Sequence, residues 1–339
     1  MSKILVISDI HLHRWNYGAT VTKEGFNSRL IGQFEYLMSL GNLAKERGVY
    51  DIICLGDLFH TNSTIHAEVL MAATCAVQRL QWEYGINFHC LVGNHDMTSK
   101  DGQIHSLHWV RSNGKLIDKA TVFDIGDRKI SALPYTENVQ QLADFFKTSE
   151  ELVLLHQGVN LNDNRGSAWV LNEIFTKEMV PDHVKRVLTG HYHKPIDDGK
   201  ISIVGSPMQH TWSDYDDAAR GCMILDLDTL ETERIVNNYS PRFLKLDWIE
   251  DEYTYLPKNF FVKISNCPKD KMEHFREDIL NDGAVSVEFE IAGNVEKKEV
   301  SPVFTSFDQI VQEYDEAVDG RRREVGRLLR DNMYETPKS

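Results

Sequence analysis

The stretch Lys3-Ile4-Leu5-Val6-Ile7-Ser8-Asp9-Ile10-His11 indicates the fold class of this chain more clearly than any other. Its four consecutive apolar residues, 4–7, predict a short strand that is buried on both faces, as strands of parallel sheets are. Asp9 and His11 follow this strand directly. Polar side chains just after a buried strand are typical of α/β sheets, which bind ligands beyond the carboxyl ends of their strands.

The same arrangement recurs along the first 205 residues. Further buried strands are predicted at 52–55, 88–92, 152–155 and 187–188. The polar clusters that follow them are Gly56-Asp57 with His60, Gly93-Asn94-His95-Asp96, His156-Gln157-Gly158, and Gly190-His191 with His193. Apolar residues at helical spacing predict helices at 28–47 and 65–84. Strands that alternate with helices predict a largely parallel sheet with helices on both faces.

The pattern changes after about residue 201. Short strands at 201–204, 222–227, 232–236 and 243–246 lack helical crossovers, so they predict an antiparallel second sheet. We therefore expect a two-sheet α/β sandwich over residues 1–250. Residues 260–265, 269–280 and 285–291 predict a β-α-β unit, which forms a small capping domain at 257–300. Residues 306–335 predict helix with a break at Asp319-Gly320, so 301–339 form a helical tail.

Composition sets limits on function. The chain has 339 residues, a formal net charge of −14, 42% hydrophobic and 26% charged residues, which excludes collagen-like and wholly disordered classes. No apolar run approaches about 18 residues, so we expect no membrane partner. The first residues are too short an apolar stretch for a signal peptide, and the five scattered cysteines fit free thiols, so a cytoplasmic protein is expected. The acidic charge excludes a uniformly basic surface but not a local basic groove.

The polar clusters predict a metal centre. Thirteen of the fourteen histidines lie before residue 211, and many adjoin Asp, Asn or Gly. Oxygen and nitrogen donors without a thiolate suit Mn²⁺, Fe or Zn²⁺ better than Mg²⁺ or Ca²⁺. There are too many donors for one ion, but two ions about 3.5–4 Å apart that share a carboxylate would use them all. Such a pair can hold a phosphate and activate a water molecule as the nucleophile.

Taken together, the five clusters resemble the signature motifs of the calcineurin-like metallophosphoesterase superfamily. The motifs read Asp9-Ile10-His11, Gly56-Asp57-Leu58-Phe59-His60, Gly93-Asn94-His95-Asp96, His156-Gln157-Gly158 and Gly190-His191-Tyr192-His193. Gly205-Ser206-Pro207, the β-α-β unit and the helical tail are similar to the SbcD-type double-strand-break repair nucleases, which include phage recombination endonucleases.

This resemblance implies a role for each site residue. The first metal ion would be held by Asp9, His11, Asp57 and His193, and the second by Asp57, Asn94, His156 and His191, so that Asp57 bridges the pair. Among the remaining polar residues, His95 would serve the leaving oxygen as a general acid, His60 would orient the phosphate, and Asp96 would orient His95.

The chain departs from the superfamily pattern at one position. The superfamily usually has glycine where this chain has His13. Its imidazole either contacts the substrate phosphate or points to solvent. The loop from Trp212 to Asp217, with Tyr215, is likewise open to two interpretations, a platform for a base and a plain surface loop.

The resemblance also implies a function and partners. It implies a Mn²⁺-dependent DNA nuclease with 3′-to-5′ exonuclease activity on duplex ends and endonuclease activity on single strands. It further implies a homodimer and an SbcC-type coiled-coil ABC ATPase as partner. The basic, amphipathic tail, which contains Arg321, Arg322, Arg323, Arg327 and Arg330, is either a solvated face or the docking segment for that ATPase.

Two alternatives remain open at this point. The same metal centre would serve a phosphodiesterase or phosphatase for small molecules or phosphoproteins, since it acts only on the phosphorus. The second alternative is a scaffold subunit that binds DNA and the ATPase without cutting. A catalytically inactive relative would be expected to lose metal ligands, and none of the expected ligands is missing here.

Overall fold

The computed structural model describes residues 2–161, 175–215, 219–248 and 258–290. Its first sheet has six strands in the order β14-β13-β1-β2-β3-β4. β1 to β4 are parallel, while β13 pairs with β1 and β14 with β13 in antiparallel fashion. The bounds are β1 (Lys3–Ile7), β2 (Asp51–Cys54), β3 (Asn87–Leu91), β4 (Lys115–Ile117), β13 (Gly221–Asp226) and β14 (Thr232–Val236).

The second sheet also has six strands, in the order β11-β12-β10-β7-β6-β5. Its four central strands are parallel and its two edge strands are antiparallel to their neighbours. The bounds are β5 (Thr121–Ile125), β6 (Arg128–Leu133), β7 (Leu152–Leu155), β10 (Arg186–Thr189), β11 (Ile196–Asp197) and β12 (Ile201–Ile203). A short parallel pair, β8 (Val159–Asn160) and β9 (Phe175–Thr176), stands apart from this sheet.

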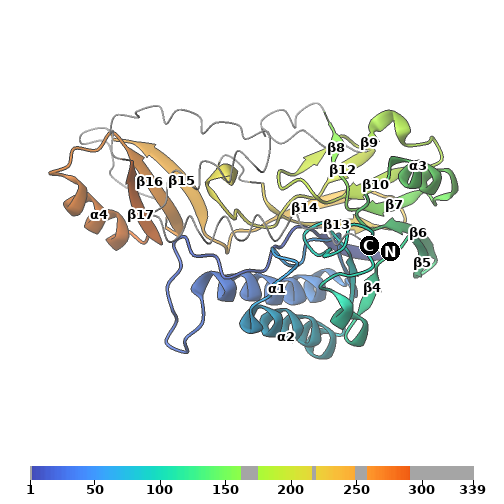
Figure 1. Cartoon of the computed structure of the whole chain (residues 1–339), viewed down its shortest axis with the longest axis horizontal. Coiled ribbons are helices and arrows are strands. Elements are labelled where there is room, and N and C mark those ends of the chain that lie inside the picture. Colours follow the sequence, from blue (N-terminus) through green and yellow to red (C-terminus); the bar gives the residue numbers. More distant parts are fainter. Residues whose placement is uncertain (1, 162–174, 216–218, 249–257, 291–339) are drawn as a thin grey trace, which may run out of the picture. The chain divides into compact units, whose positions relative to one another are not determined.

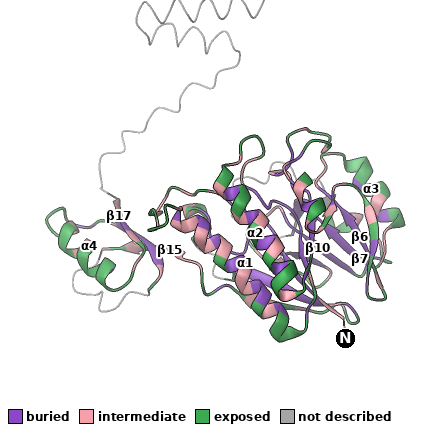
Figure 2. Ribbon diagram, turned by 90° about the horizontal axis from the view of Figure 1, so that it is seen from below, coloured by how far each residue is buried: buried purple, intermediate pink, exposed green. Residues whose placement is uncertain are grey.

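Helices cover the outer faces of the two sheets. α1 (Ser28–Arg47) and α2 (Ala67–Tyr84) lie side by side, and α3 (Val139–Thr148) lies beside β6 and β7 (Figure 1). The 3₁₀ helices among the described residues are η1 (His108–Ser112), η3 (Lys177–Met179) and η4 (Trp212–Asp214). α1 and α2 have buried residues on one side and exposed residues on the other, whereas central strands such as β7 and β10 are buried along their whole length (Figure 2).

The alternation of side chains along β1 shows how the layers pack. Leu5 and Ile7 join the apolar cluster that contains α1 and α2, whereas Ile4 and Val6 join the cluster between the two sheets. A third cluster joins the other face of the second sheet to Leu142 and Phe146 of α3. Since every strand of the parallel centre is covered twice, its residues read as continuous apolar runs. The predicted two-sheet α/β sandwich is confirmed.

The pairing of the later strands differs from the prediction of an antiparallel second sheet. The strand at 201–204 is β12, which is parallel to β10, and the strands at 222–227 and 232–236 extend the first sheet as β13 and β14. The five polar clusters therefore follow strands of two sheets instead of one. The choice of partner depends on packing between residues far apart in sequence, which local patterns do not record.

A third, small sheet follows the sandwich. It contains β15 (Arg242–Asp247), β16 (Phe260–Ser265) and β17 (Ser286–Glu290), all parallel, with α4 (Met272–Asn281) as the crossover between the last two. The predicted β-α-β unit is present, but the strand predicted at 243–246 pairs with it and not with the sandwich. The proposed domain boundaries stay predictions, and the predicted tail at 301–339 lies outside the described residues. Among the described helices, none is long and apolar enough to cross a membrane.

Candidate metal centre

The loops after β1 and β2 run together at one edge of the first sheet. Backbone N–H groups of Asp9, His11 and Leu12 donate to the carbonyls of Gly56 (3.1 Å), Asp57 (3.0 Å) and Leu58 (2.8 Å). These bonds extend the β1–β2 pairing beyond the strands themselves. As a result, the first two polar clusters are held at a fixed distance from one another.

The backbone at this edge is strained at four of the predicted ligands. Asp9, His11, Asp57 and His191 have φ of 52°, 48°, 52° and 81°. Left-handed conformations are uncommon for residues other than glycine and persist where the surrounding structure enforces them.

Two glycines make room for the crowded ligand loops. A Cβ on Gly93 would lie 2.2 Å from Asp57 Oδ1 and 2.4 Å from the Asp57 nitrogen. A Cβ on Gly56 would lie 2.5 Å from His156 Nδ1, and its φ of 116° is itself unsuited to other residues. Both glycines are therefore required by close approach to predicted metal ligands.

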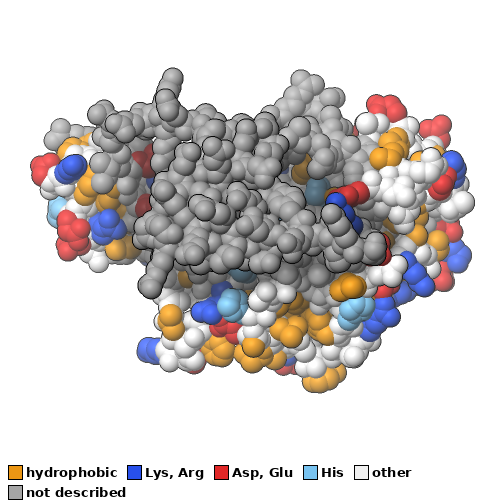
Figure 3. All heavy atoms as spheres, in the orientation of Figure 1, with side chains coloured by type: hydrophobic (Ala, Val, Ile, Leu, Met, Phe, Trp, Pro, Cys, Tyr) orange, Lys and Arg blue, Asp and Glu red, His pale blue; other side chains and the backbone are white. Residues whose placement is uncertain are grey.

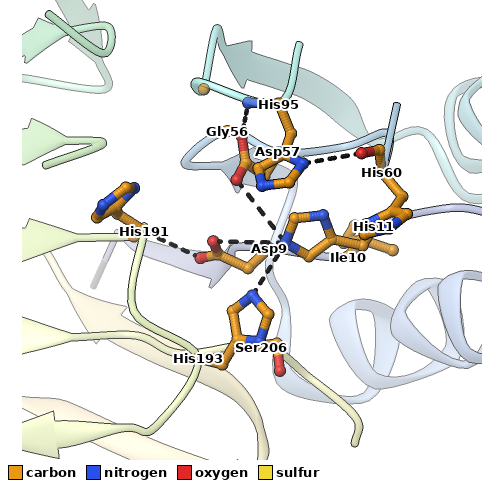
Figure 4. Close-up of polar contacts among 12 residues, drawn as sticks. Asp9, Ile10, His11, Gly56, Asp57, His60, His95, His191, His193 and Ser206 are labelled. Carbon is orange, nitrogen blue, oxygen red and sulfur yellow. Dashed lines mark hydrogen bonds and ion pairs between the residues drawn. The ribbon is translucent and has the colours of Figure 1, made fainter. Parts of the chain in front are cut away.

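One group of side chains gathers around His11. Its Nε2 lies 3.0 Å from His193 Nε2, 3.7 Å from Asp57 Oδ2 and 4.0 Å from Asp9 Oδ1. Figure 4 shows these side chains meeting from three loops, with Asp9, Asp57 and His193 arranged around one nitrogen of the His11 ring. Asp9, His11 and His193 each offer a ligand atom within the reach of a single ion. The structure thus brings together the four residues predicted to hold the first ion.

A second group gathers on the other side of Asp57. His156 Nε2 lies 3.3 Å from Asp57 Oδ2 and 3.1 Å from Asn94 Oδ1, and His191 Nδ1 lies 2.8 Å from the same Asn94 oxygen. Two ligand atoms that each lie about 2.0–2.2 Å from one ion are about 3 Å from each other, as these atoms are. These are the four residues predicted for the second ion, and Asp57 lies between the two groups.

Burial makes this arrangement costly without cations. Asp9 and Asp57 are 0% and 1% exposed, and Asp9 Oδ1 accepts no hydrogen bond among the described residues. Burial and the Asp57 charge raise the pKa of Asp9. Although burial of the Asp57 carboxylate acts toward a higher pKa, His156 and His11 lower the pKa of Asp57. Buried carboxylates that share too few hydrogen-bond donors fit a site that binds cations.

The predicted imidazole ligands differ in their charge preference. Although burial opposes it, Asp57 raises the pKa of His156 to about 10. Burial lowers the pKa of His191 to about 4, and it lowers the pKa of His11 well below the usual value. The ligand atoms are imidazole nitrogens and carboxylate or amide oxygens without sulfur, which suits Mn²⁺, Fe or Zn²⁺, and an ion bound at His156 would replace the proton that Asp57 stabilises there. The residues present therefore fit a pair of such ions.

Comparison with known proteins agrees with this geometry. The model of a family described as calcineurin-like phosphoesterase matches residues 2–195, more than half of the chain. The chain belongs to this family. It is therefore a metal-dependent phosphoesterase, a hydrolase, and its relatives use dinuclear metal centres. The predicted superfamily is confirmed.

Individual relatives were also found for this phosphoesterase. Exonuclease subunit 1 of Enterobacteria phage T4 is 25% identical over 244 residues, which cover 68% of this chain and 67% of the relative. Among solved structures, a dimetal phosphatase from Danio rerio has 12% identity over 67% of this chain and 92% of its own, with a TM-score of 0.41. A novel archaeal phosphodiesterase has 14% identity over 69% of this chain and 99% of its own, with a TM-score of 0.35.

His95 and His60 line the same site in this phosphoesterase. The His95 ring lies 4.7 Å from the His11 ring, and its Nδ1 lies 2.8 Å from the carbonyl oxygen of His60. The backbone N–H of His95 donates to Asp57 Oδ1 at 2.8 Å. The rings of His95 and His60 are stacked, with their centres 5.5 Å apart. Both residues are thus close to the predicted ions without belonging to the two ligand groups.

Asp96 does not orient His95 as predicted. Its fully buried carboxylate accepts the backbone N–H groups of Asp57 (2.8 Å), Gly93 (3.0 Å) and Phe59 (3.2 Å). Burial and the Asp57 charge raise the pKa of Asp96 to about 7. The His95 ring is oriented instead by the His60 carbonyl. The correct role of Asp96 is to hold two ligand loops together, because its side chain turns back toward the backbone.

The alternatives for His13 and the Trp212 loop can now be compared with the structure. The partly exposed His13 ring lies 5.0 Å from the His60 ring, so it borders the site without contacting the two ligand groups. Trp212 packs against Phe243 with ring centres 4.7 Å apart, and the Lys245 ammonium lies 3.9 Å from the Tyr215 ring. The loop aromatics therefore pack on the small sheet, and Asp216 and Asp217 lie outside the described residues.

Sequence reasoning missed two residues at the site. His210 is buried, and its Nε2 lies 3.2 Å from the carbonyl oxygen of Asp9. Tyr135 stacks against His191 with ring centres 5.6 Å apart. His210 follows Gly205-Ser206-Pro207 closely, so that motif was a usable signal. Tyr135 follows β6, a strand that the sequence did not reveal, and carries no motif of its own.

Proposed function

We propose that this phosphoesterase is a two-metal DNA nuclease that degrades duplex ends in the 3′-to-5′ direction and cuts single strands. The carrying observation is the similarity to the phage T4 exonuclease subunit. It covers 68% of the chain, more than the stretch 2–195 that the family model matches. A role in recombination and double-strand-break processing in the cytoplasm, or the host cytoplasm if phage-encoded, follows from the same likeness.

The site residues support phosphodiester hydrolysis. When bound by the two ligand groups that share Asp57, divalent cations, in first place Mn²⁺, supply Lewis-acid stabilisation of the phosphate and activation of water. Because the His60 carbonyl can only accept, His95 Nδ1 carries a proton and donates it to that carbonyl. To act as the general acid, the ring holds a second proton on Nε2, gives it to the leaving 3′ oxygen and is left as the neutral tautomer with Nδ1 protonated. His60 fixes this ring and narrows the site beside it.

The proposal is tested with purified full-length protein and three substrates. Linear duplex DNA labelled at each end, a single-stranded oligonucleotide and bis(p-nitrophenyl) phosphate are incubated with Mn²⁺, Fe²⁺, Zn²⁺ or Mg²⁺. We expect Mn²⁺ to support cleavage of both nucleic acids, with loss from the 3′ ends of the duplex. Hydrolysis of small phosphodiesters, cyclic nucleotides or phosphoproteins with both nucleic acids left intact would establish the alternative phosphoesterase function.

We further propose that the protein is a homodimer that works with an SbcC-type coiled-coil ABC ATPase. Support comes from the name of the phage relative, a subunit, and from the amphipathic pattern of the tail sequence. The full chain co-expressed with such an ATPase should elute as a complex of two copies of each in size-exclusion chromatography with light scattering. Leu328→Asp/Leu329→Asp in the tail should release the ATPase while Mn²⁺-dependent cleavage by the isolated protein persists; a complex that survives contradicts this docking site.

A further inference from the structure

A cleft of about 810 Å³ adjoins the predicted metal centre, beyond the carboxyl ends of β3, β4 and β6. Its lining includes Val92, which directly precedes Gly93-Asn94, and Tyr135, whose ring is stacked on His191. The backbone N–H of Tyr135 donates to the carbonyl of Val92 at 3.0 Å, which joins the two walls. Tyr135 therefore borders the cleft and also contacts His191 of the site.

The lining of this cleft combines an apolar floor with a polar rim. Val92, Met97, Leu133 and Pro134 lie beside Tyr135, and the amide side chains of Gln103, Asn138 and Gln141 lie around them. Its volume falls within the range of roughly 300–1,000 Å³ that is common for sites of small organic molecules. A flat heterocyclic base suits the aromatic and apolar floor, and amides can pair with the edges of such a base.

The charged residues around the cleft balance one another, but two exposed lysines leave their ammonium groups available to phosphates. Arg111 pairs with Asp118, and Asp101 accepts Ser99 Oγ (2.6 Å) and the Gln103 N–H (3.1 Å). Lys100 and Lys119 line the cleft, are exposed and form no ion pair among the described residues, and the carboxylates of Asp101 and Glu137 balance their charge. Over the described part of the face in Figure 3, acidic and basic side chains are interspersed. A polyanion would therefore be held at a local site and not over a broad basic surface.

We propose that this cleft binds a short single-stranded segment of the nucleic acid, next to the phosphate that is cut. An unpaired base lies against Tyr135 and the apolar floor, and the flanking phosphates lie at Lys100 and Lys119. This inference rests on the proposed nuclease function. A paired base exposes only its edges in the grooves of a duplex, so the strand in the cleft has separated from its complement.

The test compares two charge-reversal variants of the full-length protein. Lys100→Glu/Lys119→Glu removes the proposed phosphate contacts, and Lys45→Glu/Lys147→Glu makes the same change in net charge on exposed residues of α1 and α3. Each is assayed with Mn²⁺ on a single-stranded oligonucleotide and on bis(p-nitrophenyl) phosphate. Each phosphate contact to a single strand contributes about 0.7 to the slope of log affinity against log salt. We expect the cleft variant to lose about 1.4 in that slope and about 25-fold in kcat/KM on the oligonucleotide at 0.1 M salt.

A second pair of variants tests the aromatic wall. Tyr135→Phe should keep the oligonucleotide kcat/KM, and Tyr135→Ala should reduce it about 10-fold at unchanged metal content, because base stacking is lost. Both lysine double variants should hydrolyse bis(p-nitrophenyl) phosphate at the wild-type rate, whereas each Tyr135 variant is judged by the ratio of its kcat/KM on the oligonucleotide to its kcat/KM on this small substrate. The cleft proposal is overturned if Lys100→Glu/Lys119→Glu has the slope and kcat/KM of the control. If the wild type itself hydrolyses the small substrate but neither binds nor cuts the oligonucleotide, the nuclease function fails and the cleft proposal with it.

Discussion

Replacing Gly93 by alanine tests whether close packing of the ligand loops sets the metal geometry. The added Cβ would lie 2.2 Å from Asp57 Oδ1 and 2.4 Å from the Asp57 nitrogen, whereas ordinary contacts begin at 3.4 Å, so Asp57 must move by about 1 Å. Overpacking of a buried site costs about 1–3 kcal/mol of unfolding free energy. A displacement of this size at a predicted bridging ligand should reduce kcat/KM by about 100-fold or more.

The assay uses three readouts and a matched glycine. Gly32 lies within α1, and a Cβ added to it would have no neighbouring atom within 4 Å, so Gly32→Ala should keep activity and raise stability by about 0.5–1 kcal/mol. Hydrolysis of bis(p-nitrophenyl) phosphate, bound Mn²⁺ by mass spectrometry and urea unfolding are measured for both. If Gly93→Ala keeps activity within twofold of the wild type with the same metal content, the close approach to Asp57 does not control the site.

Three further predictions follow from the site and its surroundings. His95→Ala should lower kcat by about 10²–10⁴-fold with bound Mn²⁺ unchanged, and full activity would refute its role as general acid. Although burial of the ring acts toward a lower pKa, in the metal-free protein Asp57 raises the pKa of His156 from 6.5 to about 10. The pairing of protonated His156 with Asp57 therefore stabilises the folded state fully below pH 6.5, and this stabilisation is lost as the pH rises to 10. The Tm of chelator-treated protein should fall across this window, and a flat profile would contradict the pairing. Arg29 donates hydrogen bonds to the backbone carbonyls of Tyr17 (3.3 Å), Gln209 (3.3 Å) and His210 (3.1 Å), so Arg29→Ala should lower the unfolding free energy by about 2–4 kcal/mol. The control Arg47→Ala removes only an exposed ion pair and should leave the urea midpoint unchanged.

The convergence of the predicted ligands could be anticipated because each follows a strand that is buried on both faces. Such strands read as apolar runs, and their polar successors mark the carboxyl edge of a sheet. The structure places Asp9, Asp57 and His156 within reach of one another even though 147 positions separate the first from the last. Residue type and position were enough here, since the chemistry depends on which atoms meet and not on which sheet supplies them.

Other features were not accessible from the sequence. β5 alternates between exposed and buried positions, and β6 begins with Arg128-Lys129 and contains Ser131, so no continuous apolar run marks either strand. The role of Asp96 depends on its rotamer, because the same carboxylate can face a ring or three backbone N–H groups. The pairing of β15 with β16 was missed since the strand at 243–246 precedes the β-α-β unit and nothing local records its partner.

The hydrogen bonds between the loops after β1 and β2 have a consequence for protein engineering. Because Asp9, His11 and Leu12 are bonded to the backbone at Gly56, Asp57 and Leu58, neither loop keeps its shape without the other. Grafting the part of this site that carries Asp9, His11 and Asp57 into another scaffold would require both segments to be transplanted as one two-stranded module. A recipient protein would need two adjacent parallel strands that end level with each other, and a single inserted loop would not suffice.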